Sequence, residues 1–201
     1  MNALAKHTLS HDEYLQWEDL QEYKSEYYAG EVFSQAGASS KHTELAGNLF
    51  ALVHSHLKGK SCRAYISDMK LRISEVDAFF YPDVMVTCDN RDRNIDMYKQ
   101  YPVLVVEVLS ASTAEYDRTF KFACYQKIST LRDYLLISQE VFSVEHLHLN
   151  DSLEWVRTVH TYDDVFHLAC INLNVAVSDV YADVDGVITL EEKYQRPTVV
   201  N

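Results

Sequence analysis

The chain has 201 residues, enough for one domain with a substantial core, and its 47% of hydrophobic residues is typical of globular rather than disordered proteins. Its formal net charge of −12 argues against a tight, indiscriminate binder of nucleic acid, because sequence-independent affinity for DNA depends on a basic surface. No apolar run reaches the roughly 18 residues of a membrane span, and residues 1–9 lack the apolar stretch of a secretory signal. We therefore predict a cytoplasmic protein without membrane association, formed by a single domain over residues 1–201, with its core at about 13–184 and a loose polar tail over 185–201.

The first part of the chain contains two helix signals separated by a turn signal. Ser10-His11-Asp12-Glu13 reads as a capping box and predicts a short amphipathic helix to about Leu20. Ala29-Gly30-Glu31 indicates a turn between two short strands. Ser39 or Ser40 then caps a longer helix, which ends near Gly59 and carries apolar residues three and four apart.

Strand patterns dominate the remainder of the chain. We expect strands around 62–66, 69–73, 82–87, 103–109, 134–137, 141–149 and 153–160, a helix over 112–128, and a last short element over 172–177. Helices that flank a mixed sheet with antiparallel edge strands give an α/β sandwich.

The cysteines and the paired histidines invite a metal interpretation that the spacing does not favour. The four cysteines are scattered, with no Cys-x-x-Cys pair, which predicts reduced thiols and neither a zinc knuckle nor a disulfide framework. His54-x-His56 and His146-x-His148 place two imidazoles close together, and the second pair could chelate zinc from one face of a strand. Without a further Cys or His at ligand spacing, solvated polar positions are the favoured interpretation of both pairs.

Two acids interrupt segments that otherwise resemble buried strands. Asp83 lies between Tyr81-Pro82 and Val84-Met85-Val86, and Glu107 lies within the aliphatic run 103–109. Runs without polar alternation predict strands covered on both faces, where an unmatched carboxylate costs several kcal/mol. Two such acids on neighbouring strands predict a divalent-metal site, with Asp83 and Glu107 as oxygen ligands of Mg²⁺ or Mn²⁺.

The same residues carry a resemblance to a known family. Pro82-Asp83 followed by Glu107-Val108-Leu109 resembles the PD-(D/E)XK nuclease superfamily, whose signature is an Asp, a second acid and a lysine two residues after it. The order and spacing of further segments resemble the Uma-two family of restriction endonuclease-like proteins, from about residue 13 to 184. These segments are Ala29-Gly30-Glu31-Val32, Ser39-Ser40-Lys41-His42, Ser67-Asp68-Met69-Lys70, Glu107-Val108-Leu109-Ser110-Ala111-Ser112-Thr113 and Tyr116-Asp117-Arg118-Thr119-Phe120-Lys121-Phe122-Ala123-Cys124-Tyr125.

The resemblance implies a fold, an activity and a cofactor. The expected fold is a restriction-endonuclease-like α/β core, and the expected activity is metal-dependent hydrolysis of phosphodiester bonds in DNA with Mg²⁺ or Mn²⁺. Enzymes of this kind often act as homodimers so that both strands are cut. With a net charge of −12, we expect only weak non-specific binding of DNA.

The sequence departs from the superfamily signature at one position. Leu109 stands where the lysine is expected, and Lys121 on the following helix is the natural replacement. Asp117, Lys121 and Tyr125 are four residues apart and therefore share one helix face, which could point at the metal. The alternative is that Asp117 and Lys121 form only a surface pair worth about 0.3–0.5 kcal/mol.

Two further residues are candidates for supporting roles. Glu31, just after a turn, could be another acidic ligand or could position a metal-bound water. His42, near the start of the long helix, could contact phosphate or act as an acid or base, although a histidine there is more often a cap or a surface residue.

The missing lysine and the acidic charge also favour a second function. The chain could be a catalytically inactive nuclease-fold protein that binds nucleic acid or a protein partner, or one in which the fold serves self-association. The sequence contains no legible recognition helix, zinc finger or basic arm, so it does not specify a substrate.

Overall fold

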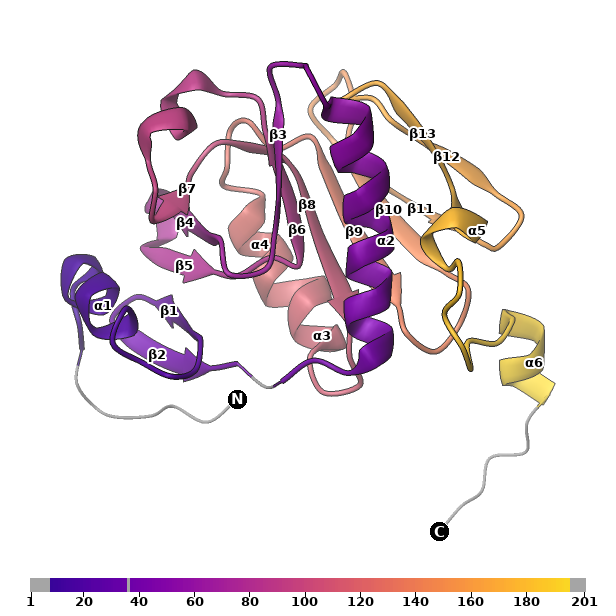
Figure 1. Cartoon of the computed structure of the whole chain (residues 1–201), viewed down its shortest axis with the longest axis horizontal. Helices are drawn as coiled ribbons and strands as arrows, with labels where there is room; N and C mark the ends of the chain where they lie inside the picture. Colours follow the sequence, from indigo (N-terminus) through magenta and orange to yellow (C-terminus); the bar gives the residue numbers. More distant parts are fainter. Residues whose placement is uncertain (1–7, 36, 196–201) are drawn as a thin grey trace, which may run out of the picture.

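The computed structural model describes residues 8–35 and 37–195, which fold into two sheets, a separate hairpin and flanking helices (Figure 1). The elements are, in chain order, α1 (His11–Glu18), β1 (Ser25–Tyr28), β2 (Glu31–Ser34), α2 (Ser40–Leu57), β3 (Arg63–Ile66), β4 (Lys70–Ile73), the 3₁₀ turn η1 (Ser74–Val76), β5 (Ala78–Phe80), β6 (Val84–Thr87), the 3₁₀ turn η2 (Asn90–Asn94), β7 (Tyr98–Lys99), β8 (Pro102–Leu109), α3 (Ala114–Tyr116), the π-helical η3 (Asp117–Lys121), α4 (Phe122–Tyr125), β9 (Asp133–Ser138), β10 (Val144–Leu149), β11 (Trp155–His160), β12 (Val165–Leu168), β13 (Leu173–Ala176), α5 (Val177–Val180) and α6 (Leu190–Gln195).

The larger sheet has six strands in the order β11-β10-β9-β8-β6-β3. Only β8 and β9 run parallel in it, and the other neighbours are antiparallel. A second sheet of five strands has the order β2-β1-β5-β4-β7, and β12 pairs with β13 as a separate hairpin. The prediction of a mixed sheet flanked by helices with antiparallel edge strands is therefore confirmed.

Each face of the six-stranded sheet has its own apolar core. On one face α2 packs through Leu45, Leu49 and Val53 against residues of β6, β8 and β9. On the other face the α3–α4 segment packs through Tyr125 and its neighbours. Figure 1 shows α2 in front of this sheet and α3 and α4 farther back. Val105 and Leu109 of β8 point toward the α3–α4 side, and because side chains alternate along a strand, Glu107 between them points the same way.

The helix predicted over 112–128 is interrupted in the structure. A π-helical segment, Asp117–Lys121, separates α3 from α4, and the helix ends at Tyr125. A π segment places one extra residue in a turn and commonly occurs at functional sites. Here it contains both Asp117 and Lys121, which are 3% and 5% exposed, so they do not form the surface pair that was the alternative interpretation.

The N-terminal helices begin where the sequence indicates. Ser10 and Glu13 form a complete capping box at the start of α1. Ser39 is the N-cap of α2, where its hydroxyl accepts a hydrogen bond from the backbone N–H of His42. Within residues 8–35 and 37–195, no helix has both the length and the hydropathy of a membrane span.

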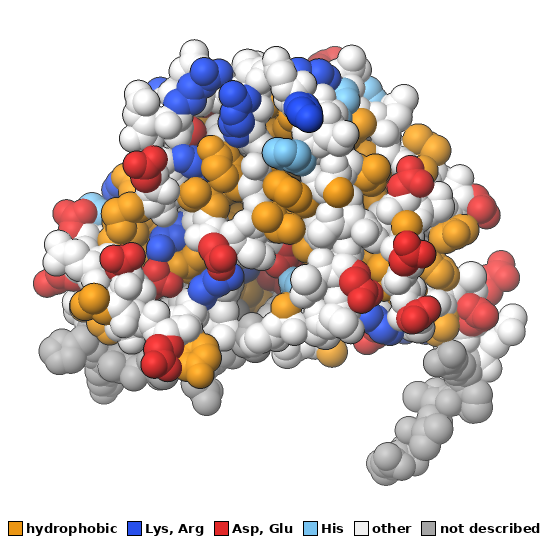
Figure 2. All heavy atoms as spheres, in the orientation of Figure 1, with side chains coloured by type: hydrophobic (Ala, Val, Ile, Leu, Met, Phe, Trp, Pro, Cys, Tyr) orange, Lys and Arg blue, Asp and Glu red, His pale blue; other side chains and the backbone are white. Residues whose placement is uncertain are grey.

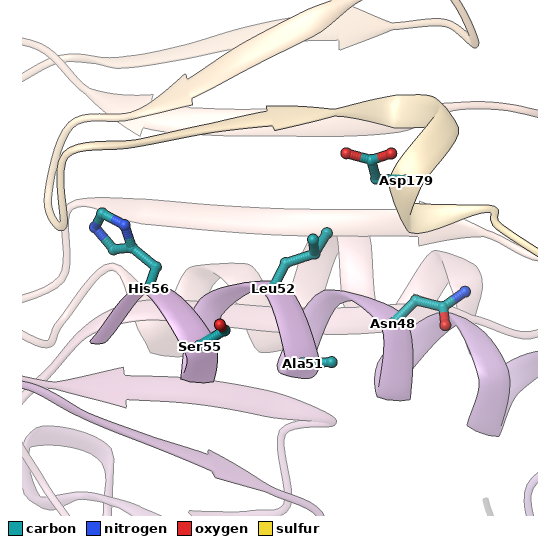
Figure 3. A pocket seen from close by; sticks show the side chains of 6 residues that line it. All are labelled: Asn48, Ala51, Leu52, Ser55, His56 and Asp179. Atoms are coloured by element: carbon teal, nitrogen blue, oxygen red, sulfur yellow. The ribbon is translucent and has the colours of Figure 1, made fainter. Parts of the chain in front are cut away.

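Charge is unevenly distributed over the surface. Figure 2 shows Lys and Arg side chains gathered along the upper rim, at the end where α2 stops and β3 begins, whereas Asp and Glu side chains lie mainly lower, on both sides. A groove of about 680 Å³ follows the exposed side of α2 (Figure 3). It is lined by Asn48, Ala51, Leu52, Ser55 and His56 of α2 and by Asp179 of α5.

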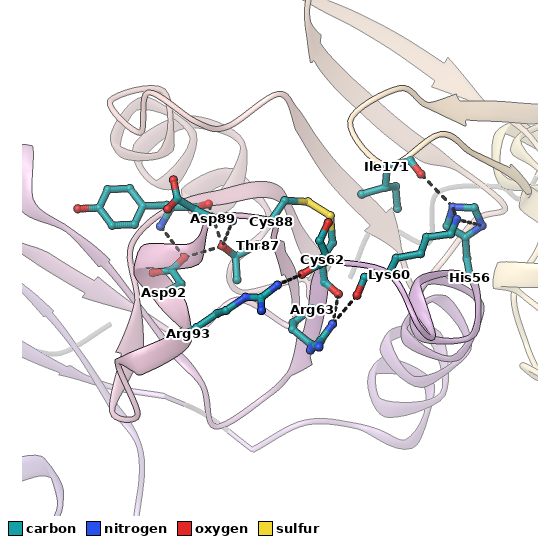
Figure 4. Close-up of a disulfide and its surroundings, with 12 residues drawn as sticks. His56, Lys60, Cys62, Arg63, Thr87, Cys88, Asp89, Asp92, Arg93 and Ile171 are labelled. Carbon is teal, nitrogen blue, oxygen red and sulfur yellow. Dashed lines mark hydrogen bonds between the residues drawn. A yellow bond between two sulfur atoms is a disulfide. The ribbon is translucent and has the colours of Figure 1, made fainter.

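The prediction of four reduced cysteines is wrong for two of them. Cys62 and Cys88 form a disulfide, with their Cα atoms 4.0 Å apart, at the end of the β3–β6 pair (Figure 4). The register Arg63↔Thr87, continued outward by one residue, places Cys62 directly opposite Cys88. Cys124 and Cys170 are free.

The solvated interpretation is also wrong for one histidine pair. His146 is 5% exposed, and its Nε2 lies 2.7 Å from Oδ1 of Asp133 across the β9–β10 pair. The imidazole is therefore a buried partner of a carboxylate.

The disulfide predicts a redox-dependent stability. Because the bond closes a loop with a sequence separation of 26, reduction should lower the free energy of unfolding by about 3 kcal/mol, mainly through the entropy of the unfolded chain. Urea unfolding with and without reductant measures this difference, and thiol titration of the denatured protein should find two reactive thiols before reduction and four after it.

The double variant Cys62→Ser/Cys88→Ser is the control, and its unfolding should not respond to reductant. Four reactive thiols in the unreduced, denatured protein would contradict the disulfide.

Candidate active site

Asp83 lies immediately before β6, where it is held by the neighbouring strand β8 and by α2. Its Oδ2 accepts a hydrogen bond from the backbone N–H of Val108 at 2.6 Å, and its Oδ1 lies 2.7 Å from Nε2 of His42. The register Val84↔Val106, continued by one residue, places Asp83 opposite Glu107. The two acids that the sequence singles out therefore occupy facing positions on adjacent antiparallel strands.

His42 is oriented by the first turn of α2 and by a glutamine after β9. Gln139 donates a hydrogen bond to the backbone oxygen of Leu109 and has its Nε2 3.5 Å from Nδ1 of His42. The Ser39 hydroxyl in turn donates to Oε1 of Gln139 at 2.7 Å. The imidazole thus bridges the helix cap and the carboxylate of Asp83, and its side chain remains 20% exposed.

Glu107 is buried against two groups from the π segment and α4. Its Oε1 accepts hydrogen bonds from the Tyr125 hydroxyl at 2.7 Å and from Nζ of Lys121 at 3.1 Å. The superfamily signature would place a lysine at position 109, two residues farther on the same face of β8. The helix instead delivers the ammonium of Lys121 to that face.

A third acid, which the sequence patterns do not single out, completes the surroundings of Lys121. Oε1 of Glu26, in β1 of the five-stranded sheet, lies 2.8 Å from Nζ of Lys121. The same oxygen accepts hydrogen bonds from Nε2 of Gln35 and from the backbone N–H of Tyr81. Oδ1 of Asp117 is farther from Nζ, at 3.7 Å. Lys121 therefore faces three carboxylates from three different elements.

The structure does not bring Glu31 into this cluster. Glu31 opens β2 after the Ala29-Gly30 turn, and its side chain is exposed. Glu31 pairs with Tyr28, two residues along β1 from Glu26, so both acids lie on the same face of the hairpin. Glu31 stands at the turn end, where its side chain is exposed, whereas Glu26 is buried farther along β1.

Negative charge exceeds positive charge in the cluster. Burial raises the pKa of Glu107 well above its ordinary value; Lys121 opposes this shift, and Asp117, Asp83 and Glu26 add to it. Burial likewise raises the pKa of Asp117. For Lys121, burial disfavours the charged form, but Glu107, Glu26 and Asp117 together raise its pKa well above the ordinary value. A single buried ammonium thus balances the charge of several carboxylates. The remaining negative charge would attract a further cation.

The donor set fits a hard cation that keeps much of its water. Within residues 8–35 and 37–195, no three His, Cys, Asp or Glu side chains are arranged to hold a metal ion together. Asp83 and Glu107 are oxygen donors at facing positions, and among the described residues Oε2 of Glu107 accepts no hydrogen bond. Mg²⁺ is typically bound by one or two carboxylates together with waters and substrate phosphate, so two facing acids meet its requirement.

Comparison with known proteins places these residues in a family. The sequence profile of the Uma2 (Uma-two) family, described as "putative restriction endonuclease", matches residues 11–178. The chain belongs to the Uma2 family. Asp83, Glu107 and Lys121 all lie within the matched range.

Two relatives from Synechocystis resemble this chain over most of their length. The uncharacterized protein slr1290 of Synechocystis sp. is 40% identical over 173 residues, which cover 86% of this chain and 91% of that protein. A second Synechocystis protein, the uncharacterized sll1609, is 39% identical over 148 residues, which cover 73% of this chain and 84% of the relative.

A solved structure shares the fold of this Uma2 chain. The crystal structure of "a putative nuclease belonging to DUF820" from Anabaena variabilis aligns with a TM-score of 0.71 over 87% of this chain and 98% of that one. The sequence identity is 19%, so this likeness concerns the fold.

Removing the Lys121 ammonium tests the charge balance of the cluster. Lys121→Met should lower the free energy of unfolding by about 3–5 kcal/mol near neutral pH, because it leaves buried carboxylates without their counter-charge. Since the pKa values of Glu107 and Asp117 are raised, these carboxylates take up protons at a higher pH in the folded state than in the unfolded state. The loss of stability in Lys121→Met should therefore shrink as the pH falls toward the ordinary carboxyl pKa.

Urea unfolding over a pH series measures this effect. Lys193→Met is the matched control, because Lys193 pairs with Glu140 at the surface and its removal should change stability little. Equal losses in both variants, or a Lys121→Met loss that does not depend on pH, would contradict the charge balance.

Proposed function

We propose that this Uma2 chain is a metal-dependent endonuclease that hydrolyses phosphodiester bonds in DNA, with Asp83 and Glu107 holding Mg²⁺ or Mn²⁺. One observation supports this most directly: Asp83 and Glu107 occupy facing positions on β6 and β8, and Lys121 reaches Glu107 from the helix. This is the arrangement of two acids and a lysine expected of the superfamily, with the lysine supplied from another element.

The residues of the chain take separate roles in the proposed reaction. When bound, the divalent ion would lower the pKa of a water and offset charge on the phosphate. Asp83 and Glu107 would hold the ion, while the Val108 N–H and His42 keep the Asp83 carboxylate oriented. Lys121 would orient the attacking water or offset negative charge on the reacting phosphate.

Glu26, Asp117 and Tyr125 are positioning residues in this proposal. Glu26 and Asp117 keep Lys121 protonated, since their carboxylates raise its pKa. The Tyr125 hydroxyl fixes one oxygen of Glu107, so that the other oxygen is left for the metal. Cutting both strands of a duplex would use two such sites, and we expect a homodimer, which light scattering would detect.

The structure also favours a second candidate function. The ammonium of Lys121 contacts three carboxylates. If no metal ion takes over the carboxylates, this lysine is only a structural counter-ion. The chain would then be an inactive nuclease-fold protein that binds nucleic acid or a protein partner. Metal binding separates the two functions.

Metal binding is the first test of the endonuclease proposal. Calorimetric titration with Mn²⁺ should detect one site in the wild type and none in Asp83→Ala or Glu107→Ala, because each variant removes one of the two facing carboxylates that would hold the ion. Glu31→Ala is the matched control and should bind Mn²⁺ like the wild type, since this exposed acid lies outside the cluster.

Circular dichroism should show that all of these variants are folded. Absence of Mn²⁺ binding by the wild type, also with a DNA oligonucleotide present, would favour the inactive nuclease-fold protein.

DNA cleavage tests the assigned role of Lys121. With Mg²⁺ or Mn²⁺, the wild type should convert supercoiled plasmid to nicked and linear forms, and Lys121→Met should be slower by a factor of about 10² or more, as expected when charge stabilisation of the reacting group is lost. Lys121→Arg keeps the charge and should retain more activity than Lys121→Met. Equal rates for the wild type and Lys121→Met would exclude a catalytic lysine at this position.

A further inference from the structure

A cluster of basic side chains lies at the end of the six-stranded sheet opposite the candidate active site. Lys58 and Lys60 follow the last turn of α2, and Arg63 opens β3. Arg91 and Arg93 belong to η2, just after β6. All five side chains are exposed. Figure 1 shows the end of α2 and the start of β3 at the upper rim, where Figure 2 shows Lys and Arg side chains gathered. We call these five residues the cationic rim.

The charge of the cationic rim is largely uncompensated. Residues 45–67 contain no Asp or Glu, in a chain whose net charge is −12. Within the described part of the chain, Arg91 is the only one of the five in a salt bridge, with Asp89. Lys60 contacts the ring of His56, Arg63 donates to two backbone carbonyls, and Arg93 donates to the carbonyl of Ser61. Bonds to carbonyls orient these groups without neutralising them.

The acid that lies between Arg91 and Arg93 in η2 is buried and hydrogen-bonded within the protein. Asp92 is 1% exposed, and it accepts hydrogen bonds from the Thr87 hydroxyl and from the backbone N–H groups of Gln100 and Tyr101. Several basic side chains outside the cationic rim are neutralised by acids. Lys24, Lys70 and Arg118 each pair with a carboxylate, that of Asp68, Glu18 and Glu145 respectively. Lys41, next to His42, donates to the carbonyl of Gly186, so positive charge outside salt bridges is not confined to the cationic rim, where four of the five basic side chains are of this kind.

The Cys62–Cys88 disulfide holds the two halves of the cationic rim together. It joins the segment that carries Lys58, Lys60 and Arg63 to the segment that carries Arg91 and Arg93 (Figure 4). Arg93 adds a hydrogen bond across the same junction, to Ser61. Cations held in a fixed geometry lose little entropy when they bind a regularly charged polymer.

We propose that the cationic rim binds the phosphodiester backbone of DNA, as a surface separate from the candidate active site. The choice of DNA as the polyanion rests on the proposed endonuclease function. The helix α2 runs from the candidate active site to the cationic rim, because His42 in the first turn of α2 contacts Asp83 and Lys58 follows the last residue of α2. Its 18 residues span about 27 Å, the rise of roughly eight base pairs, so one duplex could contact both.

Binding of labelled DNA in the presence of EDTA tests the cationic rim without any cleavage. Fluorescence anisotropy over a salt series should show that Lys58→Gln/Lys60→Gln lowers the affinity about tenfold or more at roughly 0.1 M salt and reduces the slope of log K against log salt by about 2, roughly one unit for each phosphate that is no longer neutralised. Lys24→Gln/Lys193→Gln removes the same charge from two lysines that already pair with acids and should weaken binding much less. Equal reductions of affinity in the two variants, or no binding by the wild type at low salt, would overturn the proposal.

Two further arms identify the ligand and separate this proposal from the endonuclease function. Duplex and single-stranded DNA are compared with vesicles of an anionic phospholipid, and a weakening in Lys58→Gln/Lys60→Gln that is confined to vesicles would overturn the assignment to DNA. Plasmid cleavage is measured separately with Mn²⁺. Rim-dependent binding without cleavage would contradict only the endonuclease proposal, whereas cleavage by the wild type without rim-dependent binding would contradict only this one.

Discussion

The ammonium of Lys121 is the interaction on which the candidate site depends. It lies within 4 Å of carboxylate oxygens from Glu26, Glu107 and Asp117. Glu26 belongs to the five-stranded sheet, Glu107 to the six-stranded sheet, and Lys121 itself to the helical segment. One buried charge therefore fixes the relative position of three parts of the fold. A buried cation without these partners would be strongly unfavourable, and so would the acids without the cation, so the elements are stable together in this arrangement.

The sequence identifies the acids because of their surroundings. Asp83 and Glu107 interrupt aliphatic runs. Burying an acid in such a run is unfavourable unless a cation or a hydrogen-bond donor contacts it, so the pattern predicts a special role at both positions. Lys121 follows from its spacing to Asp117 and Tyr125 on one helix face. Glu26 has no such contrast, because Lys24 and Ser25 precede it and only tyrosines follow in the same strand. Its burial depends on packing between the two sheets, which is a tertiary property.

Other features depend on details that residue patterns do not encode. The π segment differs from an α-helix by the partner of a few backbone hydrogen bonds, and Asp117–Lys121 has an ordinary helical composition. The disulfide depends on the β3–β6 register, since Cys62 and Cys88 are 26 residues apart and face each other only once that register is set. Net charge is likewise a sum over the chain, and a value of −12 does not reveal that basic side chains gather at one end of the sheet.

The disulfide also has a topological consequence. The chain between Cys62 and Cys88 leaves the six-stranded sheet through β3, contributes β4 and β5 to the five-stranded sheet, and returns through β6. The disulfide closes residues 62–88 into a covalent ring, which passes through both sheets and contains Asp83. If β4 and β5 separate from their neighbours, they remain a tethered loop of fixed length, and the strand that carries Asp83 keeps its anchor beside β3.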